Sequence, residues 1–146
     1  MKEEKSVMGT RKAIFPKRPH VLYQQYSYSP AILSGDMLFV SGMVGALEDG
    51  TPEPDLKKQV QLAFDSLQEV LKEAACTFDD VVDVTMFLID PVASVDFVLD
   101  SMKKAFPREP LANATMVGVT WLAGFQFEIK VIAKVPAHPP GPSMSR

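Results

Sequence analysis

The stretch that decides the fold runs from residue 59 to residue 90: "QVQLAFDSLQEVLKEAACTFDDVVDVTMFLID". In its first half, apolar residues recur at helical spacing and form one stripe: Val60, Phe64, Leu67, Leu71 and Ala74. The segment Thr77-Phe78-Asp79-Asp80 then has the pattern of a capping box, which marks a single turn. The last part, "VDVTMFLID", is rich in residues that favour strands. We therefore expect an amphipathic helix that leads through one turn into a strand it can cover.

The flanking sequence predicts four more strands and a second helix, in the order ββ, α, β, α, ββ. This order is typical of an α+β domain. Asp55 is expected to cap the first helix, and Ser94 the second. Pro107 and Pro110 end the second helix. The expected strands cover residues 31–33, 37–45, 82–89, 114–120 and 126–135, and the helices cover residues 56–75 and 95–106.

Two amphipathic helices can cover only one face of this sheet. Yet "MLFVSGMVG" (residues 37–45) and "FEIKVIAKV" (residues 127–135) are too apolar for their second side to face water. The simplest way to bury that side is against other copies of the chain, so we expect an oligomer.

Length and composition limit the classes of function. The chain has 146 residues and a net charge of −3, which fits one domain and does not favour nucleic acid or anionic lipid. A single cysteine, Cys76, excludes an intrachain disulfide and a cysteine-rich metal cluster, and we read it as a small buried side chain. The two histidines, His20 and His138, lie outside the expected core, so we expect no metal and no cofactor.

The ends of the chain differ from its middle. Residues 1–19 are charged and are expected to be a flexible arm, residues 20–135 the domain, and residues 136–146 a disordered proline-rich tail. The N-terminus has no signal-peptide pattern and no apolar run is long enough to span a membrane, so we expect a cytoplasmic protein. The sequon Asn113-Ala114-Thr115 is then not expected to be glycosylated.

A few polar residues on or beside the strands are candidates for a site. Glu128 is either on the solvent side of an edge strand or a carboxylate in a partly dry cleft that can move a proton. Asn113 and Thr115 are either a hydrogen-bonded strand start or the neutral floor of a cleft. Tyr28 is either core or cleft wall, and Gly42 marks a bulge or a close approach of backbone or ligand.

Three stretches resemble the RidA/YjgF family of reactive imine deaminases. They are "YSYSPAILSGDMLFVSGMVG", the helix and strand quoted above, and "FEIKVIAKV", which together span about residues 26 to 135. The stretch "GVTWLAGFQFEIKVIA" is similar to the YjgH-like branch. The resemblance implies a chorismate-mutase-like fold with a mixed sheet and two helices on one face. It also implies a homotrimer with a central barrel and a small-molecule cleft at each subunit interface.

The resemblance also assigns roles to residues of this chain. Glu128 would position the attacking water, Tyr28 would form a wall of the cleft, and Gly42 would present its backbone to the ligand. Fifteen residues before Glu128, where the deaminases have a carboxylate-binding arginine, this chain has Asn113, and Thr115 stands where many have cysteine. An amide cannot replace the charged, bidentate fork of arginine, and Arg108 is the nearest basic residue in the sequence.

Two functions follow as hypotheses. The first is hydrolysis of a small imine or enamine by water that Glu128 activates. The second is a non-catalytic trimer that binds or senses a small metabolite, which the missing arginine favours. A third function, endoribonuclease or translation inhibitor, is known from family labels. The acidic chain, without a histidine in its core, supports it little.

Overall fold

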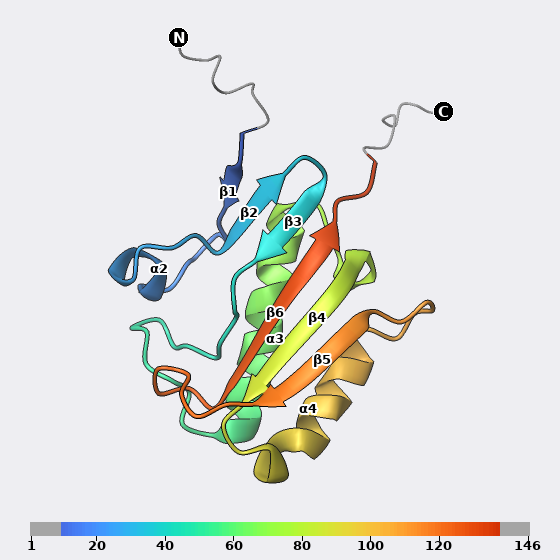
Figure 1. The fold of residues 1–146 in the computed structure, drawn as a ribbon. Helices are drawn as coiled ribbons and strands as arrows, with labels where there is room; N and C mark the ends of the chain where they lie inside the picture. Colours follow the sequence, from blue (N-terminus) through green and yellow to red (C-terminus); the bar gives the residue numbers. More distant parts are fainter. Residues whose placement is uncertain (1–9, 138–146) are drawn as a thin grey trace.

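Figure 1 shows a single sheet with two long helices packed on one of its sides. The structure is a computed structural model that describes residues 10–137. Its strands are β1 (Lys12–Ile14), β2 (Ala31–Ser34), β3 (Met37–Val40), β4 (Val81–Leu88), β5 (Asn113–Gly118) and β6 (Phe127–Lys134). Its helices are α2 (Leu22–Gln25), α3 (Leu56–Glu73) and α4 (Pro91–Ala105), and a 3-10 turn covers Phe78–Asp80.

The strands lie in the order β1-β2-β3-β6-β4-β5. Only β4 and β5 are parallel, and α4 connects them; the other neighbours are antiparallel. The sheet is therefore mixed, with α3 packed on β6 and α4 packed on β4 (Figure 1). This arrangement confirms the expected α+β fold with two helices on one face.

Helix α3 forms where its apolar stripe predicts. The Asp55 carboxylate caps it by accepting a hydrogen bond from the backbone N–H of Lys58 at 3.0 Å. Thr77 and Asp80 form the expected capping box after its end. All five stripe residues are buried, and Phe64 stacks on Phe127 of β6 with ring centroids 5.8 Å apart. The stripe thus forms one side of the core, and the inward residues of the sheet, those of β4 and β6 among them, form the other side.

Helix α4 begins earlier than predicted, and Ser94 does not cap it. Asp90 is the cap, because its side chain accepts from the backbone N–H of Ala93 and Pro91 fits the first helical position, where no N–H is needed. Ser94 is buried inside the helix, and its hydroxyl donates to the carbonyl of Asp90 at 2.9 Å. A serine and an aspartate four residues apart both suit a cap, and proline selects the earlier one.

Two short elements were not predicted. Lys12–Ile14, in the arm that was expected to be flexible, pairs with β2 as the edge strand β1. Leu22–Gln25, in the expected domain, forms the one-turn helix α2. Both are too short to carry a periodic pattern, so their local sequence gives little signal. Residues 1–9, which were expected to be flexible, and residues 138–146, which form most of the proline-rich tail, lie outside the described residues.

The face of the sheet away from the helices is mixed in character. Phe39 and Val117 are exposed there, and Phe87 and Ile132 are half-buried. The same face carries the charged residues of β6, because that strand alternates with its apolar residues inward. The expectation of a second side too apolar for water therefore holds for part of the face and is wrong for the charged positions of β6: Glu128, Lys130 and Lys134.

Candidate functional site

A cavity of about 370 Å³ brings together three of the five predicted site residues: Tyr28, Gly42 and Glu128. It lies where the chain leaves β3 and enters β6. The other lining residues come from α2 and the residue after it, from the loop between β3 and α3, and from the loop between β5 and β6: Leu22, Tyr26, Val44, Gly50, Pro52, Trp121, Leu122, Ala123 and Phe125.

A bulge sets Gly42 against Glu128. Phe39 pairs with Ile132 and Met43 with Ile129, so the β3 side advances four residues while β6 advances three. The extra residue bends the chain at Gly42. A β-carbon at Gly42 would overlap Oε2, Cδ and Cγ of Glu128. The expected bulge is confirmed, and the close approach at this glycine is made by the Glu128 side chain, whereas an approach of backbone or ligand was expected.

Burial controls the electrostatics of Glu128. Its side chain is half-buried, and desolvation raises the pKa of the carboxyl above its ordinary value, while the charge of Lys130 partly opposes this. Lys130 does not form an ion pair with it; its Nζ donates to the carbonyl of Val40 at 3.2 Å. A carboxylate that is partly dry and short of donors has the properties of a general base.

Tyr28 forms the wall between the core and the cavity. Its ring meets Tyr23 edge to face, with centroids 5.0 Å apart, and it packs against the main core. Desolvation raises the pKa of its phenol, and the nearby negative charge of Glu128 raises it further. Tyr28 is therefore part core and part wall, with a neutral hydroxyl near the carboxylate.

Gln59 positions the loops of the cavity, and sequence reasoning missed it. This α3 residue is 3% exposed. Its amide nitrogen donates to the carbonyl of Glu53 at 2.9 Å, and its amide oxygen accepts from the backbone N–H of Gln126 at 2.8 Å. One buried amide thereby joins the two loops that line the site. The available signal was a glutamine in the first turn of the helix, directly before Val60, where the apolar stripe begins.

The loop before β6 supplies a second missed feature. Trp121 is 75% exposed at the edge of the cavity. The loop turns through Ala123 and Gly124, which both have positive φ, and the N–H of Phe125 bonds the carbonyl of Leu122 at 3.0 Å. The resemblance included "WLAGF" without giving it a role, although an exposed tryptophan seven residues before a half-buried carboxylate is itself a signal.

Asn113 and Thr115 do not lie in this cavity within one chain. Asn113 pairs with Asp83, which pairs with Ile132, four residues along β6 from Glu128. At about 3.3 Å per residue this separates them by roughly 13 Å along the strands alone. Both polar residues are exposed on the open face, and the Asn113 amide donates to Oδ1 of Asp83 at 2.5 Å.

A second cavity, of about 430 Å³, lies beside Asn113 and also contains Arg108. The guanidinium Nε of Arg108 lies 3.2 Å from Oδ2 of Asp79, and both side chains are largely exposed. Glu109 lines the same cavity. Arg108 is therefore close to the position of the missing arginine, but it is paired and accompanied by a second carboxylate.

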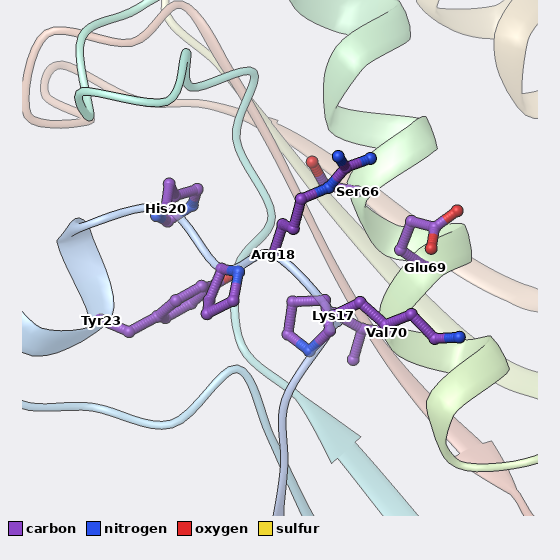
Figure 2. Close-up of a pocket in the computed structure, with 9 residues that line it drawn as sticks. Lys17, Arg18, His20, Tyr23, Ser66, Glu69 and Val70 are labelled. Atoms are coloured by element: carbon purple, nitrogen blue, oxygen red, sulfur yellow. The ribbon is translucent and has the colours of Figure 1, made fainter.

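A third cavity, of about 550 Å³, lies between the segment that follows β1 and helix α3. Figure 2 shows Lys17 and Arg18 extending toward the helix, where Glu69 lies, so charges of both signs line this groove. His20 stacks on Tyr23 with centroids 4.3 Å apart. None of the predicted site residues lines this groove.

The histidines and the cysteine offer no alternative chemistry in residues 10–137. His20 Nδ1 accepts a hydrogen bond from the N–H of Leu22, and burial lowers its pKa; His138 lies outside the described residues. Cys76 is buried as predicted, and desolvation raises the pKa of its thiol to about 11, which keeps it protonated. The described part contains no cluster of metal-ligating side chains, and none of its helices is long and apolar enough to cross a membrane.

Known proteins resemble this chain over most of its length. The sequence model of the family described as endoribonuclease L-PSP matches residues 19–135. The RutC family protein YjgH of Escherichia coli is 55% identical over 88% of this chain and 98% of that protein. A solved structure of protein YJGH has a TM-score of 0.83 and covers the same shares at 55% identity. The Rid family protein YyfA from Yersinia pestis has a TM-score of 0.75 at 27% identity, covering 86% of this chain and all of that one.

The match of the family model, the shared fold and the bulge that sets a strand glycine against a half-buried glutamate agree with the resemblance read from the sequence. This chain belongs to the RidA/YjgF family.

Proposed function

We propose that the protein hydrolyses a small imine or enamine to a carbonyl compound and ammonia, with Glu128 as the general base. The observation that carries the proposal is the half-buried Glu128 carboxylate, which overlies Gly42 inside a cavity walled by Tyr28. Among the residues that the structure describes, none forms an ion pair with this carboxylate, so the group is available for proton transfer.

The reaction needs one carboxylate that takes up and gives back a proton twice. Glu128 takes a proton from water as the water oxygen attacks the imine carbon, and the C=N electron pair moves to nitrogen. The nitrogen takes that proton from the Glu128 carboxylic acid, which gives a neutral carbinolamine. Glu128, again a carboxylate, then takes the hydroxyl proton and passes it to the nitrogen as the C=O bond forms and the C–N bond breaks. Water has then been added and ammonia released, and Glu128 is a carboxylate again. Burial of the carboxyl brings its pKa nearer to neutral pH, which suits both roles.

We further propose that the active assembly is a homotrimer, with clefts between subunits. Asn113 and Thr115 lie on the open face far from the Glu128 of their own chain, so a neighbouring copy is needed to place them beside a Glu128 cavity. The apolar residues of that face, Phe39 among them, support burial in an oligomer. Light scattering on the purified protein tests this, and a monomeric mass contradicts it.

The catalytic proposal is tested by release of ammonia from imines generated in the assay. The wild type should accelerate release, and Glu128→Gln should lower the rate by about two to four orders of magnitude. Glu73→Gln, an equivalent change at an exposed position on α3, should leave the rate unchanged. If Glu128→Gln retains the wild-type rate, or no imine in a broad panel is hydrolysed faster, the proposal is wrong.

A non-catalytic trimer that binds a small metabolite is the second candidate. The Asn113 amide bonded to Asp83 favours it, because this pair cannot hold a carboxylate as arginine would. Ligands that raise the melting temperature without being consumed would support this candidate. The endoribonuclease name of the family model finds less support, since no basic residue within 10–137 lines the Glu128 cavity. Cleavage of RNA that survives a further ion-exchange step would revive it.

A further inference from the structure

The geometry points to a specific class of ligand for the Glu128 cavity: a positively charged imine or amine with an apolar, preferably aromatic, substituent and no carboxylate. This inference rests on the proposed function for the site and adds the chemical class of the substrate. Three groups of observations carry it: the charge of the lining, the aromatic rim, and the charge beside Asn113.

The lining has one formal charge, and it is negative. Glu128 is the only charged side chain among the described residues that line the cavity. Lys130, the nearest cation along β6, is turned to the backbone of Val40 and does not line it. A ligand carboxylate would meet a like charge and no cation, whereas an iminium or ammonium group would meet a partly desolvated counter-charge.

The rest of the wall is apolar or aromatic. Tyr26 is 68% exposed and Trp121 is 75% exposed, both at the edge of the cavity. Val44 and Phe125 are buried behind them and share a small apolar cluster. Aromatic faces attract cations by about 0.5–2 kcal/mol and also bury apolar groups. The wall therefore favours a cationic centre attached to a hydrophobic substituent.

The region around Asn113 gives an independent indication of the same preference. Asp83 accepts the Asn113 amide, so the position that would hold a substrate carboxylate is next to a carboxylate of the protein. Arg108 is paired with Asp79, and Glu109 shares their cavity. This region carries more negative than positive side chains. If a neighbouring subunit brings it to the Glu128 cavity, the combined site becomes more acidic.

Three cyclic ketimines that share a five-membered pyrroline ring test the inference. They differ only in the substituent on the imine carbon, which is phenyl, methyl or carboxylate. Isothermal titration should give the lowest Kd for the phenyl compound, then methyl, and a carboxylate Kd at least about tenfold above that of phenyl. A carboxylate compound that binds as tightly as phenyl overturns the inference, and so does the absence of binding by all three.

Three exposed positions, Trp121, Tyr26 and Arg108, provide variants that leave the core intact. Trp121→Ala should weaken binding of the phenyl compound severalfold, and binding of the methyl compound by less. Tyr26→Arg should strengthen binding of the carboxylate compound, while Tyr26→Gln, its neutral control, should not. Arg108→Ala should leave all three affinities unchanged. Loss of carboxylate binding in Arg108→Ala would show that Arg108 replaces the missing arginine, and would contradict the inference.

The two proposals fail in different ways. If the order of affinities holds but no imine is hydrolysed, the catalytic proposal is wrong and the ligand class stands. If the protein hydrolyses carboxylate-bearing imines faster than matched apolar ones, the catalytic proposal stands and the ligand class is wrong.

Discussion

Gly42 leaves the space that the Glu128 carboxylate occupies: a β-carbon at Gly42 would overlap Oε2 of Glu128. Glycine is needed here for room rather than for a left-handed backbone, since its φ is not in the positive region that marks Gly35, Gly50 and Gly124. The bulge that carries Gly42 and the strand that carries Glu128 are therefore coupled, and a change at one should be felt at the other.

Gly42→Ala should displace the Glu128 side chain and lower the free energy of unfolding by about 1–3 kcal/mol, as overpacking does. In a Glu128→Ala background the same substitution should cost clearly less, because the overlapping atoms are gone. Chemical denaturation of the four proteins of this cycle measures the coupling. Equal costs in both backgrounds would show that the two residues do not interact.

Gly42→Ala should also reduce ligand binding at the Glu128 cavity. Ser41→Ala is the neighbouring control: it removes the hydrogen bond from the Ser41 hydroxyl to the carbonyl of Ser29 at 2.7 Å but adds no atom. Titration with the phenyl ketimine should therefore show a larger loss for Gly42→Ala than for Ser41→Ala. A larger loss for Ser41→Ala would show that Gly42 is not part of the binding site.

The raised pKa of Glu128 predicts a pH dependence of stability. Above its ordinary pKa of 4.5 the unfolded chain ionises this group more readily than the folded one, so its contribution to the free energy of unfolding falls as pH rises. Glu128→Gln removes this effect. The difference in free energy of unfolding between this variant and the wild type should be constant at pH values below 4.5. It should move in favour of the variant as pH rises above that value, and should then level off.

Urea unfolding of both proteins across this pH range measures that difference, and all other titrating groups cancel between them. A difference that stays flat, or that moves in favour of the wild type as pH rises, would contradict the desolvation of Glu128.

Gln59→Ala should destabilise the cavity loops. It leaves the N–H of Gln126 and the carbonyl of Glu53 without their buried partner, which costs about 1–3 kcal/mol for each group that stays buried. Gln61→Ala, two residues along the same helix and exposed, should change stability by less than about 0.5 kcal/mol. Hydrogen exchange of the Gln126 amide should accelerate only in Gln59→Ala; if it does not, Gln59 does not hold this loop.

Asn113→Arg should fail by itself to create strong carboxylate binding, because the new guanidinium would pair with Asp83. The double variant Asn113→Arg with Asp83→Asn frees the fork, and should bind the carboxylate ketimine about tenfold more tightly than the single variant. Titration of the wild type, both single variants and the double variant measures this. Equal affinity in the single and double variants would show that Asp83 does not compete.

Much of the fold follows from local sequence. The apolar stripe around Phe64 and the capping box that begins at Thr77 are each specified by a few neighbouring residues, and both form as predicted. The start of α4 was misplaced because Asp90 and Ser94 are both good caps, and β1 was missed because three residues have no period. The start of a helix and the presence of a three-residue strand depend on partners elsewhere in the chain.

The sequence by itself determined the α+β order, the family and three residues of the cavity, because helical stripes and strand patterns are local properties. The tertiary structure alone decided which residues meet. It set Gly42 against Glu128 and joined Asn113 to Asp83. It also joined Gln59 to Gln126, which lies in a loop 67 residues further along the chain. These contacts depend on strand register and on a bulge, and both arise from packing across the sheet rather than from any neighbour in the chain.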